Sequence, residues 1–205
     1  MARDFAIRNP DKLLENMVLM RDMLAEKGVR CFLHYGTLLG AVREHGFIPH
    51  DDDADLGVFS ADTDAILTMI PALYDAGFSF LSQREGRLLQ FVRDGEQVDL
   101  FVAVPKWSIA GKRWWIDERV SIHARHLDRL DTISFLGHDF LIPTNPEGLM
   151  RFLYGKTWKI PMANIPSKTG FFWKIQKVLR NPGKMFFYVS RFFRMKKIKD
   201  ARTHS

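Results

Sequence analysis

Hydrophobic residues recur along the first part of the chain with a helical period and then in a strand-like run. After an Asn-Pro pair at 9–10, apolar residues follow each other at helical spacing until Gly28, which predicts a helix opened by proline. The run "VRCFLHY" (29–35) is β-branched and aromatic, which favours a buried strand. The stretch "TLLGAVREHG" (37–46) predicts a short helix with Thr37 near its N-cap.

Further along, strand-like alternation dominates the pattern. A hairpin is indicated where two apolar runs meet around Asp94-Gly95. Pro71 interrupts an otherwise amphipathic helical stretch. The predicted strands and hairpins cover residues 53–58, 88–104, 111–127 and 132–143, and the predicted helices cover 62–77 and 145–155. This order predicts an α/β (α+β) fold with a mixed β-sheet flanked by helices.

The stretch "IPHDDDADLGV" (48–58) places four aspartates within five positions. A calcium loop, a solvated acidic turn and a metal-binding strand edge each give such a cluster. A calcium-binding EF-hand counted from Asp51 needs glycine at position 6 and glutamate at position 12, where this chain has Leu56 and Asp62. The EF-hand is therefore excluded, and the other two interpretations remain.

Strand alternation separates the aspartates from the apolar residues between them. If 53–58 is a strand, its alanine, leucine and valine point into the core, and Asp51, Asp53 and Asp55 share the opposite face. Acids spaced in this way repel each other unless a cation lies between them. Hard oxygen ligands suit Mg²⁺ or Mn²⁺. We favour a metal site over an acidic surface, with Asp53 and Asp55 as ligands and Asp51 as a further candidate.

A third carboxylate lies later in the chain. Asp99 falls inside the apolar run "QVDLFVAV", where a charge is rare without a partner. A strand beside Asp53 and Asp55 would bring Asp99 to the same metal. The alternative is an edge strand on which Asp99 faces water.

A candidate phosphate-binding turn precedes the aspartates. In "HYGTLLGAVREHG" a strand ends at Gly36-Thr37 and a helix opens, which would aim backbone N–H groups at an anion. Thr37 could donate its hydroxyl hydrogen to a phosphate, and Arg43 could reach a second one. A Gly-Thr pair by itself is commonly an ordinary helix cap.

Together these stretches resemble the LicD family, which includes fukutin and the fukutin-related protein, within the nucleotidyltransferase-fold superfamily. The resemblance rests on "HYGTLLGAVREHGFIPHDDDADLGV", with support from "VDLF" and "GLMRFLYGKTWKIP", and covers about residues 10–165. It implies a metal-dependent transferase that moves a phosphorylated alcohol, such as phosphocholine or ribitol phosphate, from a CDP-linked donor to a glycan hydroxyl in cell-surface polysaccharide.

The resemblance also implies roles for individual residues. Asp53, Asp55 and Asp99 would be the catalytic, metal-binding carboxylates, and Gly36 and Thr37 the phosphate-binding turn. Where the family usually has an aromatic residue before the aspartates, this chain has a histidine at position 50, for which we expect a structural role. Two rival functions remain: a nucleotidyltransferase that attaches the nucleotide itself, and an inactive, membrane-associated binding module.

Charge separates the chain into two parts. Residues 171–205 hold ten basic residues and one acid, whereas the first 170 residues hold 20 basic and 23 acidic residues. We therefore expect a catalytic domain over 1–170 and a basic, aromatic, helical tail over 171–205. Residues 171–199 carry the pattern of a helix on an anionic membrane surface. A helix packed on the body is the alternative, and nucleic-acid binding is the least favoured of the three.

Cysteine content and hydropathy bear on location. The single cysteine, Cys31, permits no internal disulfide and favours a reducing compartment. No apolar segment suggests a signal peptide or a membrane span. These features predict a cytoplasmic location. The family resemblance and the basic tail together imply an enzyme that is peripheral on the inner face of the membrane and acts on a lipid-linked glycan acceptor.

Overall fold

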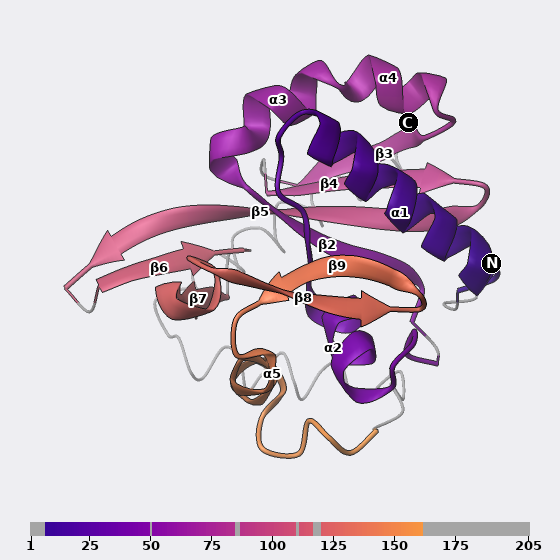
Figure 1. Cartoon of the computed structure of the whole chain (residues 1–205). Helices are drawn as coiled ribbons and strands as arrows, with labels where there is room; N and C mark the ends of the chain where they lie inside the picture. The colour runs from indigo at the N-terminus through magenta and orange to yellow at the C-terminus, as the bar shows by residue number, and fades with distance from the viewer. Residues whose placement is uncertain (1–6, 50, 85–86, 110, 117–119, 162–205) are drawn as a thin grey trace, which may run out of the picture. The chain divides into compact units, whose positions relative to one another are not determined.

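A mixed nine-stranded sheet organises the residues that the computed structural model describes, which are 7–49, 51–84, 87–109, 111–116 and 120–161 (Figure 1). The strands are β1 (Phe32–Leu33), β2 (Asp53–Phe59), β3 (Ser79–Arg84), β4 (Leu88–Arg93), β5 (Glu96–Ser108), β6 (Gly111–Trp115), β7 (Ser121–His123), β8 (Leu130–Phe135) and β9 (His138–Pro143). The helices are α1 (Pro10–Glu26), α2 (Tyr35–Arg43), α3 (Thr63–Thr68), α4 (Ile70–Asp75) and α5 (Pro146–Tyr154), with 3-10 turns at Ser60–Asp62 and Ala124–His126.

The strand order is β3-β4-β5-β2-β1-β9-β8. The pairs β2–β5 and β1–β9 are parallel, and the other neighbours in this order are antiparallel. Beyond this sheet body, the second half of β5 pairs with β6, and β6 pairs with β7. The predicted fold class, a mixed α/β sheet flanked by helices, is confirmed.

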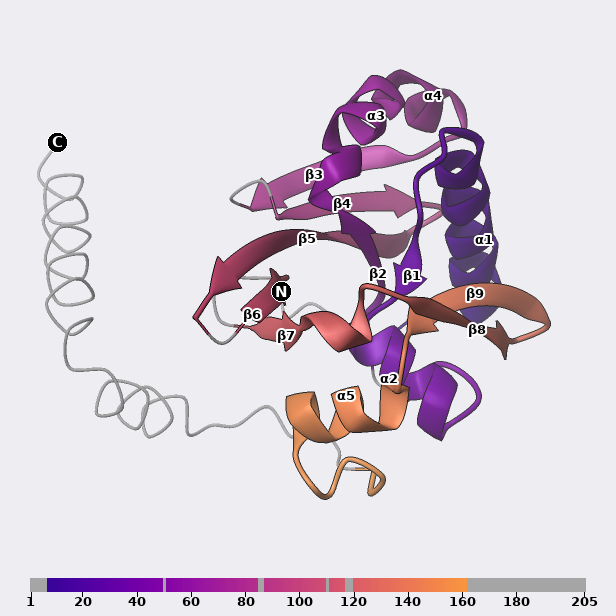
Figure 2. The same cartoon turned by 60° about the vertical axis from the view of Figure 1, so that its left-hand side comes forward.

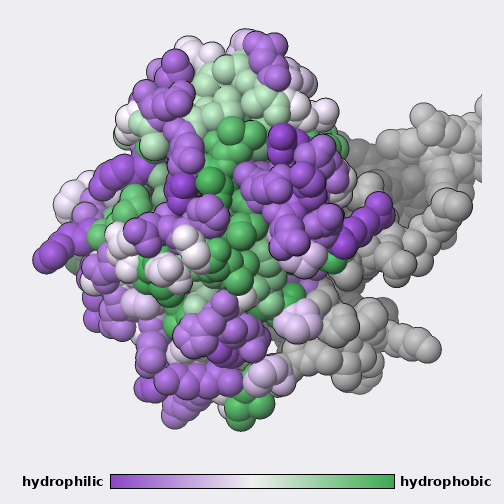
Figure 3. Space-filling view, turned by 45° about the vertical axis from the view of Figure 1, so that its right-hand side comes forward, coloured by the Kyte–Doolittle hydropathy of each residue, from purple (hydrophilic) through white to green (hydrophobic). Residues whose placement is uncertain are grey.

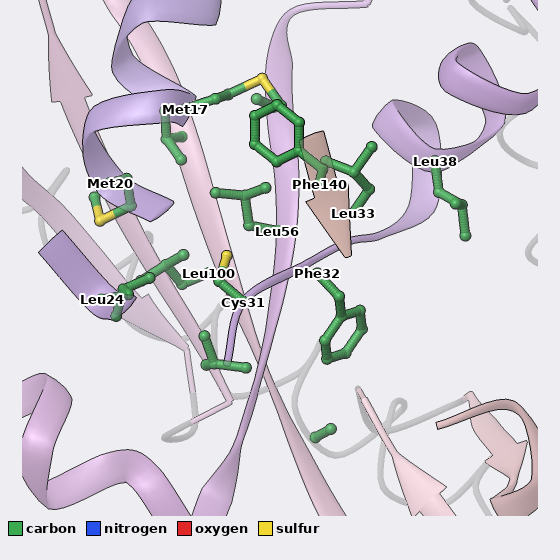
Figure 4. Packing of buried hydrophobic residues seen from close by; sticks show 14 of the residues in the cluster. Met17, Met20, Leu24, Cys31, Phe32, Leu33, Leu38, Leu56, Leu100 and Phe140 are labelled. Carbon is green, nitrogen blue, oxygen red and sulfur yellow. The ribbon is translucent and has the colours of Figure 1, made fainter. Parts of the chain in front are cut away.

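Helix α1 covers one face of the central strands. Its apolar stripe, which includes Met17, Met20 and Leu24, packs over Leu56 of β2 and Leu100 of β5, and all five side chains are fully buried (Figure 4). Asn9 caps the helix by accepting a 3.1 Å hydrogen bond from the Lys12 N–H group, as the Asn-Pro start predicts. This packing turns the even-numbered residues of β2 into core.

The opposite face of β2 is covered by α2, and α5 lies beside α2 and β9 (Figure 2). Gly57 of β2 lies under the Phe32 ring, which occupies the space that any Cβ at position 57 would need. The close approach of this ring lets β1 and β2 pair tightly at the centre of the sheet.

On the face that Figure 3 shows, hydrophilic side chains surround a hydrophobic strip, as is normal for a folded domain.

Several element boundaries differ from those predicted. The apolar run 29–35 forms only a two-residue strand, because its hydrophobicity reflects burial as much as strand pairing. Helix α2 begins at Tyr35, so Gly36 and Thr37 lie in its first turn and His34 is the N-cap. The stretch 62–77 breaks at Met69, two residues before Pro71, whose ring cannot continue a straight helix.

The hairpin predicted around Asp94-Gly95 is present, and both residues have positive φ as a tight two-residue turn requires. Its second strand, β5, is longer than predicted and extends to Ser108.

The predicted tail (171–205) and residue 50 lie outside the described residues, so the division into a domain and a tail stays a prediction. Among the helices of the described residues, none is long and apolar enough to cross a membrane.

Candidate active site

Three predicted carboxylates converge where β2 runs parallel to β5. Asp53 and Asp55 lie two apart on β2, so they share one face, and Asp55 is the direct register partner of Asp99 on β5. One carboxylate oxygen from each of the three lies within 4.8 Å of the others. Asp55 and Asp99 are buried, while Asp53 is partly exposed at the rim. The alternative of an exposed edge strand for Asp99 is wrong, because β5 lies between β2 and β4.

A row of polar side chains continues from these carboxylates across the sheet. Asp99 pairs in register with Gln90 of β4, and Gln90 pairs with Ser82 of β3. The Gln90 amide donates to both oxygens of Asp99 at 3.2 and 2.9 Å, and its carbonyl accepts from the Ser82 hydroxyl. Gln97, two residues before Asp99, donates a further hydrogen bond of 2.8 Å. Uncharged donors therefore hold the Asp99 carboxylate in place.

Sequence reasoning missed these two glutamines. Gln90 is a polar residue inside the apolar run "LLQFV", and Gln97 has the spacing that puts it on the face of Asp99. A search for polar residues at strand spacing around Asp99 would have found both. The sequence alone does not reveal the strand register that makes Gln90 the neighbour of Asp99.

The first turn of α2 holds Asp55 from the other side. The Gly36 N–H group donates a 2.8 Å hydrogen bond to the Asp55 side chain, and the Thr37 hydroxyl accepts a 2.8 Å bond from the Asp55 N–H group. Both predicted turn residues therefore lie at the site. In this structure the Gly36 N–H group serves the carboxylate, so its predicted contact with a phosphate stays a prediction.

A side chain at Gly36 would require two of the carboxylates to move. A Cβ there would overlap the Asp51 carboxylate and come within 3.2 Å of the Asp55 carboxylate. Glycine is thus required for the close approach of α2 to the acids and not for an unusual backbone conformation, since its φ lies outside the left-handed region.

The carboxylates resist simultaneous ionisation. Burial, with the nearby charge of Asp99, raises the pKa of Asp53 to about 7. Burial, with the charge of Asp53, raises the pKa of Asp55 well above its ordinary value. Burial, with the charge of Asp52, raises the pKa of Asp51 to about 6. A cation among these oxygens would favour the charged forms, and an all-oxygen set fits Mg²⁺ or Mn²⁺.

Two further residues lie at the edge of this site, and only the first of them was predicted. Arg43, on α2, pairs with Glu44 at 2.6 Å and donates a 2.9 Å hydrogen bond to the Trp158 carbonyl. It therefore joins α2 to the segment after α5, and its predicted contact with a phosphate stays a prediction. Burial, followed by the charges of Asp55 and Asp51, raises the pKa of Tyr154, a residue that sequence reasoning did not assign.

The groups of side chains in the described residues that could hold a metal ion consist of aspartates alone, and three histidines there have other contacts. His126 is buried and its Nδ1 lies 2.9 Å from the Thr144 carbonyl, while His123 Nδ1 accepts from the Arg125 N–H group. His34 is buried against the rings of Tyr35 and Phe101. These contacts are structural.

Comparison with known proteins confirms the family that the sequence resembles. The family model described as LicD/FKTN/FKRP, nucleotidyltransferase domain, matches residues 28–145, a range that contains every predicted site residue. Human ribitol 5-phosphate transferase FKRP is 29% identical over 143 residues, covering 65% of this chain and 29% of that protein. Mouse ribitol-5-phosphate transferase FKTN is 28% identical over 156 residues, covering 72% of this chain and 33% of that protein.

Other matches are more limited. An uncharacterized protein of Rickettsia prowazekii is 34% identical over 76 residues, covering 36% of this chain and 29% of that protein. The match thus spans less than half of each of these three relatives. Among solved structures, the antibiotic-resistance factor ANT(2'')-Ia gives a TM-score of 0.49 at 14% identity, covering 94% of this chain and 100% of that one. The lincosamide adenylyltransferase LnuA gives 0.48 at 9% identity, covering 70% and 85%.

Gly36→Ala tests whether α2 must approach the acids closely. We expect metal-dependent activity to fall about tenfold or more, because the new Cβ displaces the Asp51 and Asp55 carboxylates. The melting temperature should change little, since the obstructing atoms end flexible side chains. Gly46→Ala is the matched control, because a Cβ there meets only Leu136 at 3.9 Å. Equal activity of both variants would contradict the role assigned to Gly36.

Gln90→Leu tests the amide that holds Asp99. We expect Mn²⁺ affinity, measured by calorimetry, and activity to fall about 10- to 100-fold, as for other residues that orient metal ligands. Gln83→Leu, on the neighbouring strand β3 and exposed, is the control. Unchanged Mn²⁺ affinity in Gln90→Leu would show that Asp99 needs no such support.

The raised pKa values predict a pH-dependent stability. The native state keeps the proton on Asp53 up to about pH 7, whereas the unfolded chain releases it near the ordinary aspartate pKa of 3.8. The native state therefore binds more protons in this window, and its stability falls as pH rises through it. In EDTA we expect Asp53→Asn to melt progressively higher than the original chain as pH increases from about 4 to 8. A difference in melting temperature that stays constant with pH would refute this expectation.

Proposed function

The chain belongs to the LicD/FKTN/FKRP family of nucleotidyltransferase domains, and from that premise we propose that it is a metal-dependent transferase acting on a phosphorylated alcohol. The donor is a CDP-linked alcohol, such as CDP-ribitol or CDP-choline, and the acceptor is a glycan hydroxyl in cell-surface polysaccharide. The observation that carries the proposal is the convergence of Asp53, Asp55 and Asp99 on one face of the sheet. The two named relatives, both ribitol phosphate transferases, support the choice of phosphorylated alcohol.

The carboxylate set matches the needs of a diphosphate donor. Asp53 and Asp55 would hold Mg²⁺ or Mn²⁺ together with Asp99, with Asp51 as a further ligand candidate. Bound there, the metal would neutralise negative charge that builds on the diphosphate oxygens during transfer. Without a cation these residues repel each other and the donor, which accounts for the expected metal requirement.

The proposed reaction forms one bond and breaks one. The acceptor hydroxyl oxygen bonds to the phosphorus that carries the alcohol, and the anhydride bond to CMP breaks, with CMP keeping the electron pair. Asp99 accepts the hydroxyl proton. Gln90 and Gln97 orient Asp99 for this transfer through their hydrogen bonds of 2.8 to 3.2 Å. No covalent intermediate on the protein is needed, since positioning and charge neutralisation supply the catalysis.

Gly36 and Thr37 have a second role in this proposal. Besides holding Asp55 through their hydrogen bonds, they begin α2, and the N-terminal end of this helix contributes a positive dipole beside the donor phosphates.

The basic segment 171–199 belongs to the proposal on sequence grounds alone. It would hold the enzyme at an anionic membrane surface, near a lipid-linked acceptor.

Release of CMP from a panel of CDP-linked alcohols, with Mg²⁺, Mn²⁺ or EDTA, tests this function. We expect metal-dependent release that Asp53→Asn or Asp55→Asn lowers by about a thousandfold, because each removes a charge that the cation needs. Asp75→Asn, at an exposed position at the end of α4, is the matched control and should keep full activity.

The mass of the modified glycan separates this proposal from its rival. An acceptor that gains the alcohol phosphate supports the proposed reaction. An acceptor that gains the cytidylyl group would identify a nucleotidyltransferase instead. Full turnover by both aspartate variants would remove these residues from the active site.

A further inference from the structure

The β5–β6 hairpin carries two exposed apolar side chains at its tip. Trp107 is 80% exposed and Ile109 is completely exposed, and no other large hydrophobic side chain among the described residues exceeds either. The ends of β5 and β6 extend away from the rest of the sheet, on the left of Figure 1. A single exposed apolar residue is common, but two that are separated by one residue at a projecting tip suggest a partner.

Basic side chains and tryptophan rings lie behind the tip. Lys106 Nζ lies 4.7 Å from the Trp115 ring centroid, and Lys112 Nζ lies 4.5 Å from that of Trp114. Arg113 is the cross-strand partner of Lys106. From residue 101 to residue 116 there are three basic residues and no acid.

These positive charges are only partly compensated. Lys112 pairs with Asp128 at 2.7 Å, but Lys106 and Arg113 form no ion pair within the described residues. Arg113 donates hydrogen bonds of 2.9 and 2.6 Å to the hydroxyl and the carbonyl of Ser121, which are uncharged, so its positive charge remains unbalanced. The hairpin therefore presents an apolar end followed by net positive charge and indole rings. Apolar side chains at the end, with indole rings and basic groups behind them, match the order of lipid tails and headgroups at a membrane surface.

A lipid surface fits this tip better than a sugar does. Carboxylate and amide side chains offer a sugar hydroxyl both oxygen acceptors and well-directed hydrogen bonds, and residues 104–115 contain neither type. An aliphatic side chain such as Ile109 gains by leaving water, and basic groups are attracted to anionic headgroups. We propose that the β5–β6 hairpin inserts Trp107 and Ile109 into the surface of an anionic lipid bilayer, while Lys106 and Arg113 contact the headgroup phosphates.

This contact is separate from the carboxylate site. Nine residues of β5 lie between Asp99 and Ile109, which corresponds to about 30 Å of extended chain. The inference therefore stands apart from the proposed transferase chemistry, and substitutions at the tip should leave metal binding unchanged. It is also separate from segment 171–199, which could bind lipid by itself.

Sedimentation of the full chain with vesicles of phosphatidylcholine and phosphatidylglycerol tests the proposal. We expect Trp107→Ser with Ile109→Ser to weaken binding about tenfold or more, because both inserted side chains are lost. Leu67→Ser with Leu81→Ser is the control, since both leucines are about half exposed but lie on α3 and β3. Vesicles of phosphatidylcholine alone should bind the original chain weakly.

A fluorophore at the tip distinguishes insertion of the hairpin from binding through segment 171–199. Cys31 is buried, so an environment-sensitive label can be directed to Ile109→Cys, with Leu81→Cys as the control site. We expect a blue shift and quenching by brominated lipid at position 109 and not at position 81. Binding of the vesicles without a response at position 109, or no binding at all, would overturn the proposal. A response at position 109 to a soluble glycan without vesicles would overturn it in favour of a sugar site.

Discussion

The parallel pairing of β2 with β5 places Asp55 directly beside Asp99, and this contact between like charges is the constraint on which the site depends. Two carboxylates in a buried position oppose each other's ionisation, and Asp53 adds a third charge at the rim. Folding must offset that repulsion from elsewhere in the molecule. The fully buried contact of α1 with β2 and β5, on the other face of the same strands, is a large source of that free energy.

On the polar face of the sheet, hydrogen-bond donors contact the buried carboxylates. Gln90 and Gln97 donate to Asp99, and the Gly36 N–H group donates to Asp55, so uncharged hydrogen-bond donors contact both buried carboxylates. Neutral donors position the carboxylate oxygens but do not by themselves balance the negative charges. Negative charge gathered in this way attracts a dissociable cation.

The long strand β5 connects two regions of different character. Its first half lies between β2 and β4 and carries Asp99, while its second half leaves the sheet body and forms the hairpin with β6. In the sheet body, neighbouring strands and α1 bury both edges and one face of the strand. At the tip that cover is absent, and Trp107 and Ile109 remain in solvent. One strand therefore positions a buried catalytic candidate and an exposed apolar tip about 30 Å apart along the chain.

The sequence by itself determined the elements whose signals are local. The Asn-Pro starts of α1 and α5, the turn at Asp94-Gly95 and the alternation along 53–58 each depend on residues close together in the chain. The same alternation placed Asp53 and Asp55 on one face. Only the tertiary structure decided which strand lies beside them, because register depends on contacts between residues distant in sequence. For that reason Gln90 became visible as a partner of Asp99 only in the folded sheet. The shift of α2 to include Gly36 also depended on packing, since the close approach of that helix to Asp51 and Asp55 is a long-range contact.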